Sequence, residues 1–420
     1  MDGKSNVVSV TLDARRRLRI LYVCPLAHLV SHLPYAAVSE TAALAKANQD
    51  VTLLTFAPLQ YVAADPNVKL FHALGSENKN LRRLLRPALD HRRHPRIALS
   101  LAFLLTLLEV QKLRRKTRFD VIHIRDGDDF MPLVQVFGIL FGGGRWLISL
   151  LRVYERPFVL NAAFESAIGA LIYRLSLSRT RYGYVCSNQH DFDYYSERFM
   201  SGLFSKKVFL LHPIVPKPLR FPGPQEIADA RANLGITQGQ QVLLSFGVLH
   251  PGKDVETLLS AMDAIPEAVL VHAGPTYGRL KELSKMHQRL RIIVNDSFIP
   301  EDSKPVYFGL ASAVILSYTR KFTSTASNLW EACRYQVPVI ASSNEQMTDL
   351  VSRYNLGVIF EAQDSGSLEG AIRRFLAFTP QERNELKRNC ERFSDEFSSA
   401  RWAANCRKIY EELCDRQSEG

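Results

Sequence analysis

The stretch of residues 313–341, AVILSYTRKFTSTASNLWEACRYQVPVIA, predicts a strand, a loop, a helix and a second strand. Residues 313–317 are a short apolar run that favours a strand, and a helix follows at about residues 324–334. Pro338 cannot continue that helix, so the chain passes into an apolar strand at residues 337–341. A strand, a crossover helix and a second buried strand make a parallel βαβ unit. The stretch therefore predicts an α/β fold in which the loop and the helix start lie at the carboxyl edge of a parallel sheet.

The start of this predicted helix carries polar side chains on one face. Ser324, Ser327, Asn328 and Glu331 are spaced i, i+3, i+4 and i+7, so they share that face. Hydroxyl residues at a helix start supply caps, and the free N–H groups with the positive dipole end favour an anion. A carboxylate two turns further on is placed to accept sugar hydroxyls. An ordinary crossover helix with good caps would show the same pattern, and this stretch alone leaves both interpretations open.

Length and composition indicate a two-domain globular protein with an anionic partner. The 420 residues suit two domains of about 200 residues each. The net charge of +11 and the pI of about 9.4 favour a nucleotide, a lipid phosphate, a phospholipid surface or nucleic acid. Six scattered cysteines without a C-x-x-C pair argue against a zinc site and fit a reducing compartment. We expect no signal peptide and no spanning helix, and therefore a cytoplasmic protein that is at most peripheral on a membrane.

The first half of the chain opens with a predicted strand, helix and strand at residues 19–24, 31–48 and 50–56. A dinucleotide-binding unit would carry G-x-G-x-x-G after its first strand. Residues 25–34 contain no glycine, which argues against NAD or FAD. His28 lies in this loop, where it either faces a cleft at the carboxyl end of the strand or is an ordinary surface histidine.

A basic segment and an apolar segment follow one another in the same half. Residues 79–96 contain six arginines, and residues 97–110 (IALSLAFLLTLLEV) read as an apolar helix. An apolar helix flanked by cations is typical of a segment that touches an anionic membrane, so residues 82–110 are a candidate membrane surface. A helix buried on the sheet, with solvated charges at both ends, is the alternative. The next strand precedes Asp126-Gly127-Asp128-Asp129, whose D-x-D spacing suits a divalent metal or simply a solvated turn.

The second half of the chain repeats the alternation of predicted strands and helices found in the first half. A proline-rich linker at residues 213–240 separates an N-terminal domain (1–212) from a C-terminal domain (241–385) and a pair of terminal helices (386–420), which we expect to pack back on the N-terminal domain. After a strand at 241–246, Gly247 permits a tight turn, and His250-Pro251-Gly252-Lys253 leads into a helix from Asp254. A glycine turn, cationic side chains and the start of a helix together favour a phosphate-binding site. The alternative is a plain strand-to-helix turn with a solvated lysine.

Several blocks of residues 241–376 carry a family resemblance in the correct order. LLSFGVLHPGKDVETLLSAM and FTSTASNLWEACRYQVPVIAS resemble the donor-binding blocks of retaining nucleotide-sugar glycosyltransferases of the GT-B architecture. Among these enzymes the blocks resemble the glycogen-synthase-like group called family four, and the resemblance implies an enzyme of the bacterial polysaccharide or glycolipid type. The resemblance implies two Rossmann-like, doubly wound domains that face each other across a cleft. It also implies a nucleotide-sugar donor, a glycan or lipid-linked acceptor on the N-terminal side, and no bound metal or other cofactor.

The resemblance also implies roles for individual residues. Lys253 takes the place of the lysine that binds the diphosphate, Glu331 that of the glutamate that holds the ribose, and backbone amides near Thr325 and Ala326 would hold the diphosphate. The implied donor-binding residues are Gly247, Lys253, Thr323, Ser324, Thr325, Ala326, Asn328 and Glu331, and the candidate catalytic residues are Lys253, His250, Arg152 and His28.

Three positions depart from the family pattern. Val248 stands where the family has an arginine, Thr323 where it has its first glutamate, and Arg152 near the place of its N-domain histidine. His28 or His123 could serve instead of that histidine. These departures keep two alternatives open, a GT-B scaffold with impaired catalysis and a nucleotide-sugar 2-epimerase. We expect no nucleic-acid partner, because the basic residues flank an apolar helix and no recognition helix or RNP-like motif is present.

Overall fold

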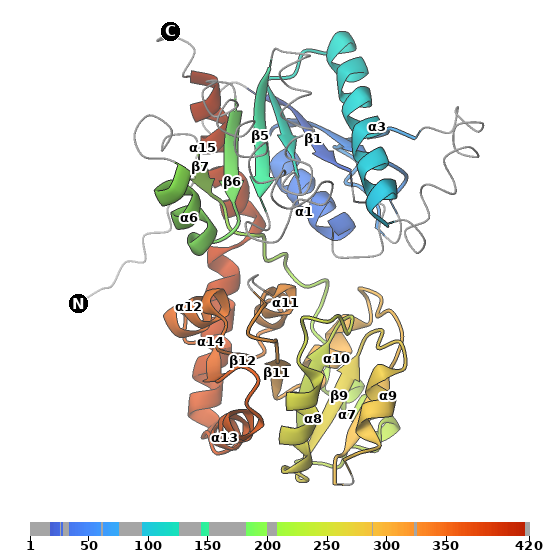
Figure 1. The fold of residues 1–420 in the computed structure, drawn as a ribbon, viewed down its shortest axis with the longest axis vertical. Coiled ribbons are helices and arrows are strands. Elements are labelled where there is room, and N and C mark those ends of the chain that lie inside the picture. The colour runs from blue at the N-terminus through green and yellow to red at the C-terminus, as the bar shows by residue number, and fades with distance from the viewer. Residues whose placement is uncertain are drawn as a thin grey trace.

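The computed structural model describes residues 17–25, 27, 33–59, 62–74, 95–125, 144–150, 182–199, 208–287, 289–322 and 326–415. These residues form two parallel sheets, each flanked by helices, and the two units lie one above the other in Figure 1.

The N-terminal sheet has the strand order β3-β2-β1-β4-β5-β6-β7, and all its pairs are parallel. Its strands are β1 (Arg19–Cys24), β2 (Asp50–Thr55), β3 (Lys69–His72), β4 (Val121–Ile124), β5 (Arg145–Leu150), β6 (Tyr182–Cys186) and β7 (Val208–Leu210). Its described helices are α1 (Leu33–Lys46), α3 (Pro95–Lys116) and α6 (Gln189–Phe199). The strand order reverses between β1 and β4. Ligands of doubly wound sheets bind outside the carboxyl ends of the strands at such a point.

The C-terminal sheet has the order β10-β9-β8-β11-β12-β13, again all parallel. Its strands are β8 (Gln241–Phe246), β9 (Ala268–Ala273), β10 (Ile292–Asn295), β11 (Ala313–Leu316), β12 (Val339–Ser342) and β13 (Gly357–Phe360). Its helices are α7 (Pro224–Asn233), α8 (Val255–Asp263), α9 (Arg279–Ser284), α10 (Lys304–Leu310), α11 (Ser327–Arg334), α12 (Glu345–Arg353) and α13 (Ser365–Leu376). Here the order reverses between β8 and β11, so the loops after these two strands meet.

The last two helices connect the two units. Helix α14 (Pro380–Glu396) packs on α11, where the rings of Trp330 and Phe393 lie 5.1 Å apart. Helix α15 (Ser399–Asp415) then packs into the core of the N-terminal sheet, and Tyr410 is fully buried there. Figure 1 shows this pair of helices running from the lower unit along the side of the upper one.

Helix α3 has one buried face and one exposed face. Phe103, Leu107 and Val110 are buried, whereas Leu104 and Leu108 are 38% and 43% exposed. Over residues 100–110 the apolar run is therefore buried on one face and leaves leucines exposed on the other, rather than being buried all round. Within the described ranges, no helix is both long enough and apolar enough to cross a membrane.

Two predictions about local structure need correction. The apolar pair Phe298-Ile299 before Pro300 predicts a further short strand at residues 298–300. That prediction is wrong, because these residues form the loop between β10 and α10 and Pro300 cannot donate to a strand ladder. The segment 213–240, predicted to be a linker, contains helix α7. Pro224 opens this helix, at a position where a missing N–H costs nothing.

Candidate active site

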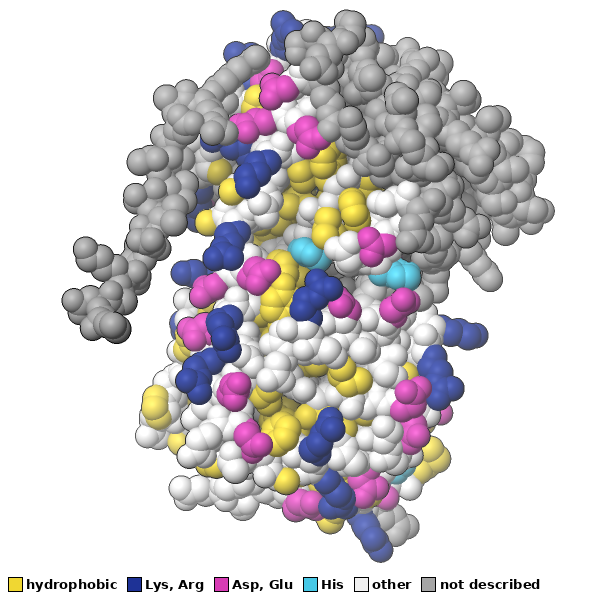
Figure 2. Space-filling view, turned by 90° about the vertical axis from the view of Figure 1, so that its left-hand side faces the viewer, with side chains coloured by type: hydrophobic (Ala, Val, Ile, Leu, Met, Phe, Trp, Pro, Cys, Tyr) yellow, Lys and Arg dark blue, Asp and Glu magenta, His cyan; other side chains and the backbone are white. Residues whose placement is uncertain are grey.

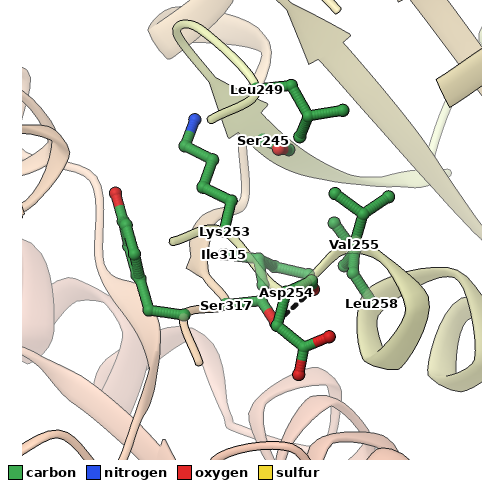
Figure 3. Close-up of a pocket in the computed structure, with 9 residues that line it drawn as sticks. Ser245, Leu249, Lys253, Asp254, Val255, Leu258, Ile315 and Ser317 are labelled. Carbon is green, nitrogen blue, oxygen red and sulfur yellow. Dashed lines mark hydrogen bonds between the residues drawn. The ribbon is translucent and has the colours of Figure 1, made fainter. Parts of the chain in front are cut away.

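Lys253 lies in the loop after β8 and turns back toward the end of that strand. Its Nζ donates to the carbonyl oxygen of Phe246 and lies 3.3 Å from that of Gly247. The residue pairs with Tyr318 after β11 in an isolated antiparallel bridge, so the loops of both central strands hold it. Figure 3 shows that the side chains of Lys253 and Asp254 extend in opposite directions. The ammonium group is therefore directed away from the nearest carboxylate in the sequence.

Lys253 is a buried cation, and no ion pair to it is found among the residues that the structure describes. Lys253 is only 9% exposed, and burial lowers the pKa of its amine to about 7. The contacts of its Nζ within the described chain are carbonyl oxygens, not carboxylates. A buried amine that is held by dipoles alone favours an anionic ligand, because the ligand would supply the missing charge.

The start of helix α11 lies at the same carbonyl group of Phe246 that Lys253 contacts. Asn328 Nδ2 donates to the carbonyl of Phe246 at 2.6 Å, so Asn328 and Lys253 converge on one oxygen atom. The N-cap residue is Ala326, whose side chain offers no hydrogen bond to the helix. The prediction of a hydroxyl cap is therefore wrong for the helix start that the structure describes. Residues 323–325, which include Thr323, Ser324 and Thr325, lie outside the described residues.

Two glycines bring the β8 and β9 loops into contact. Gly247 has φ +80° and donates to the carbonyl of Ala273 at 2.8 Å. Gly274 has φ +145°, and a Cβ there would lie 2.6 Å from the carbonyl carbon of Gly247. Only glycine fits this approach. Gly247 was predicted from the sequence as a turn residue, but the contact with Gly274 joins residues 27 positions apart and had no signal in the sequence.

Beneath this loop, His272 forms a buried support that sequence reasoning missed. Its Nε2 donates to the carbonyl of Gly274 at 3.2 Å, and its Nδ1 accepts from the Ser245 hydroxyl at 3.0 Å. Burial, together with the charge of Lys253, lowers the pKa of His272 to about 4. The neutral ring therefore holds the ends of β8 and β9 in register without adding a charge beneath the amine.

His250 belongs to an aromatic cluster beside the loop. Its Nδ1 accepts from the Gly252 N–H at 3.1 Å, and its ring lies 6.0 Å from the rings of both Tyr318 and Phe322. Tyr318 and Phe322 themselves stack at 4.2 Å. An imidazole that accepts at Nδ1 is neutral. In this arrangement His250 shapes the loop rather than adding a second positive charge.

Glu331 lies one turn into α11 and belongs to a compact network of four charges. Its two oxygens are 3.1 Å from Lys304 Nζ and 3.3 Å from Arg334 Nη1, and Glu301 contacts the same two cations. Burial disfavours the charged form of Lys304, but the two carboxylates outweigh it and raise the pKa of the lysine. The Glu331 carboxylate is thus held in place while its side chain stays 22% exposed. Lys304 also lies 5.6 Å from the ring of Tyr35 in α1, so the network touches the N-terminal domain.

Of the candidate site residues in the N-terminal half, the structure describes His123. His123 is buried, with Nδ1 2.7 Å from the hydroxyl of Tyr410 and Nε2 2.7 Å from that of Ser149. Burial, with the nearby charge of Arg125, lowers its pKa to about 3. His123 is therefore a core residue and does not replace the family's histidine. His28, Arg152, the acidic turn at 126–129 and the basic residues 82–94 lie outside the described residues.

The two domains also meet through the amino ends of α6 and α12. Gln346 lies 3.5 Å from Asp191, and His190 lies 3.3 Å from Glu345. Burial raises the pKa of Asp191 to about 6, although Asn188 and His190 act in the opposite direction. On the face shown in Figure 2, basic and acidic side chains are mixed over the C-terminal domain, and histidines lie at the level where the domains meet.

Known proteins share the fold of this chain. Residues 226–393 match the family described as glycosyl transferases group 1. No curated protein matches the chain in sequence. A glycosyltransferase from Rickettsia africae has 12% identity and a TM-score of 0.69, covering 96% of this chain and 100% of its own. Sucrose-phosphate synthase from Thermosynechococcus elongatus has 19% identity and a TM-score of 0.68, covering 94% and 99%. HepE from Anabaena, in complex with UDP and glucose, has 14% identity and a TM-score of 0.63, covering 96% and 100%.

At these identities the structural likeness concerns the fold, and it extends over nearly the whole of each chain. The predicted architecture of two Rossmann-like domains is confirmed. The matched residues 226–393 include Gly247, Lys253, Asn328 and Glu331. The chain therefore has the GT-B fold. Its residues 226–393 match the glycosyl transferases group 1 family, and the prediction of a glycosyltransferase is confirmed at that level.

Proposed function

We propose that this protein transfers a sugar from a nucleotide-diphosphate sugar to a glycan or lipid-linked acceptor, with retention of configuration, in a cleft between its two domains. The observation that carries the proposal is the buried amine of Lys253, which meets the uncapped start of α11 at the carbonyl of Phe246. HepE, whose fold is similar, has been solved with UDP-glucose. The same location in this chain offers a cation and the positive end of a helix dipole at one point, which together favour a sugar diphosphate.

The chemistry follows from this arrangement. Breaking the bond between sugar and diphosphate builds negative charge on the leaving phosphate, and preorganised charges and dipoles stabilise that charge. Lys253 and the first-turn N–H groups of α11 would act there, and Glu331 would accept the ribose hydroxyls. We propose that no metal takes part, since the ammonium and the helix end would balance the diphosphate. The family-four assignment and retention belong to this proposal and rest on the sequence resemblance.

One experiment tests the function directly. Incubating the protein with UDP-, GDP-, ADP- and dTDP-sugars, with and without lipid-linked acceptors, should give a glycosylated product and a free nucleoside diphosphate. Nucleotide binding that raises the Tm without any transfer or hydrolysis would favour a scaffold that has lost catalysis. Release of UDP and a rearranged free sugar without an acceptor would favour a 2-epimerase. The stereochemistry of the product at the transferred carbon decides retention.

Glu331→Gln should weaken nucleoside diphosphate binding roughly tenfold to a hundredfold, because it replaces a charged acceptor of the ribose hydroxyls. Calorimetric titration with the diphosphate measures this loss. Glu301→Gln is the matched control, since it removes an equal charge that contacts the same two cations. Equal losses in both variants, or a comparable loss of pyrophosphate binding in Glu331→Gln, would refute a ribose contact.

We also propose that the protein is cytoplasmic and contacts an anionic membrane surface through the segment 82–110. Helix α3 supports this with Leu104 and Leu108 on its exposed face and Arg114, Arg115 and Lys116 in its last turn. Such a face would bury its leucines between lipids while its cations meet the headgroups. A lipid-linked acceptor would then be delivered at the same surface.

Leu104→Glu with Leu108→Glu should abolish flotation with liposomes that contain anionic phospholipid, because both substitutions would place a carboxylate in the membrane interface. Leu219→Glu is the control, since Leu219 is 68% exposed but lies outside this segment. Full flotation of the double variant, or equal loss in the control, would contradict a membrane role for α3.

A further inference from the structure

Tyr277 is the most exposed of the large apolar side chains that the structure describes, at 82%. It follows Pro275 and Thr276 in the turn after β9, and its φ is +53°. An aromatic residue with positive φ is uncommon and strained, and such strain is found chiefly where a site requires it. The turn therefore holds a large ring in water at an energetic cost.

Asp296 maintains this turn. It is the first residue after β10, and its carboxylate accepts from the Thr276 N–H and hydroxyl at 2.5 Å each and from the Gly278 N–H at 3.2 Å. These bonds connect the loops at the carboxyl ends of two neighbouring strands, β9 and β10. The position of Tyr277 is consequently fixed by the fold rather than left to a free surface loop.

The turn lies beside the site of Lys253. Leu249 in the Lys253 loop donates its N–H to the carbonyl of Pro275 at 2.8 Å, and Gly274 packs against Gly247. On the other side, Glu331 contacts Lys304, which opens α10 directly after the loop that follows β10. A nucleotide with its diphosphate at Lys253 and its ribose at Glu331 would therefore extend toward the β9 and β10 loops.

We propose that Tyr277 stacks on the base of the donor nucleotide and that Asp296 is the positioning residue that presents it. This inference rests on the proposed function and adds to it the residue that holds the base. Stacking accepts either a purine or a pyrimidine face, so Tyr277 supplies affinity, while the polar atoms of the two loops would distinguish one base from another.

The test separates the base from the diphosphate. Calorimetric titration of the full chain with UDP, GDP, ADP and dTDP identifies the tightest nucleotide, and inorganic pyrophosphate serves as the ligand without a base. Tyr277→Ala should weaken nucleotide binding roughly 5- to 150-fold and leave pyrophosphate binding unchanged. Tyr277→Phe should retain the wild-type affinity, and Asp296→Ala should reproduce the selective loss. Met286→Ala is the matched control, since Met286 is 70% exposed just beyond α9.

Tyr277→Trp gives a second measurement. Its fluorescence should be quenched by the nucleotide and not by pyrophosphate, beyond any change in the wild type. Unchanged nucleotide affinity in Tyr277→Ala, or an equal loss of pyrophosphate binding, would overturn the stacking proposal and leave the donor site intact. A wild-type protein that binds none of the four nucleotides would overturn both the stacking and the proposed function.

Discussion

Lys253→Met should lower kcat for sugar transfer by roughly 10²–10³, the typical loss when one preorganised group that stabilises a developing charge is removed. Methionine is similar in length and apolar, so it fills the same buried space. The expected Tm of the variant is no lower than that of the wild type, because the wild-type amine is buried and its contacts among the described residues are carbonyl oxygens rather than carboxylates. Phe246 also keeps its hydrogen bond from Asn328. Loss of turnover without loss of stability would identify a functional lysine.

The pH dependence of the same variant gives an independent check. The pKa of Lys253 is about 7 in the folded protein and 10.5 in a model peptide. Between these values the unfolded chain binds more protons, so this group makes the wild type more stable as pH rises. The stability advantage of Lys253→Met should therefore shrink from pH 7 to pH 10. A bound diphosphate favours the charged amine, so nucleotide affinity should fall over the same range in the wild type only.

Lys285→Met is the matched control for the turnover prediction. Lys285 is exposed at the end of α9, so its replacement removes an equal charge without touching the site. Its kcat should stay within about twofold of the wild type. If Lys253→Met retained near-native turnover, or if both variants lost activity equally, the phosphate role of Lys253 would be wrong.

The sequence predicted the strands well where they are buried on both faces. β1 and β8 begin and end at the predicted residues, because strands of a doubly covered parallel sheet are continuous apolar runs. β3 was missed, since it is an edge strand whose four residues are all at least partly exposed and show no such run. Pro224 was read as part of a linker although it opens a helix, because proline is common both in linkers and at the first position of a helix.

The site was predictable only to the extent that it is local in sequence. Lys253 follows its strand by seven residues, and Asn328 and Glu331 share one helix face, so spacing alone indicated them. Lys304, one of the two partners of Glu331, comes from α10, 27 residues away, and this contact exists only because the fold brings the two helix ends together. His123 shows the converse. The family resemblance suggested it as a substitute for the N-domain histidine, but Tyr410 of α15, nearly 290 residues later in the chain, contacts it in the core.

Arg125→Met should destabilise the N-terminal domain by roughly 3–5 kcal/mol, the cost of removing one partner of a buried ion pair. Arg125 Nε lies 2.8 Å from Glu40 Oε2, and the two side chains are each 8% exposed. The hydroxyl of Tyr22 donates to the same carboxylate. Without the guanidinium, the negative charge of Glu40 would stay buried, and its donor among the described residues would be the neutral hydroxyl of Tyr22. Calorimetry should show the Tm of this domain fall by roughly 6–20 °C.

The double variant Arg125→Met with Glu40→Leu tests the cause. Two apolar side chains of similar volume leave no buried charge, and such replacements are often neutral or stabilising. The double variant should therefore recover most of the loss, which a simple packing defect would not allow. Lys112→Met is the control, because its contact with Glu109 is 2.9 Å but the lysine is 64% exposed. Exposed pairs contribute at most about 1 kcal/mol. A double variant as unstable as Arg125→Met would show that the arginine acts through its other contacts rather than through Glu40.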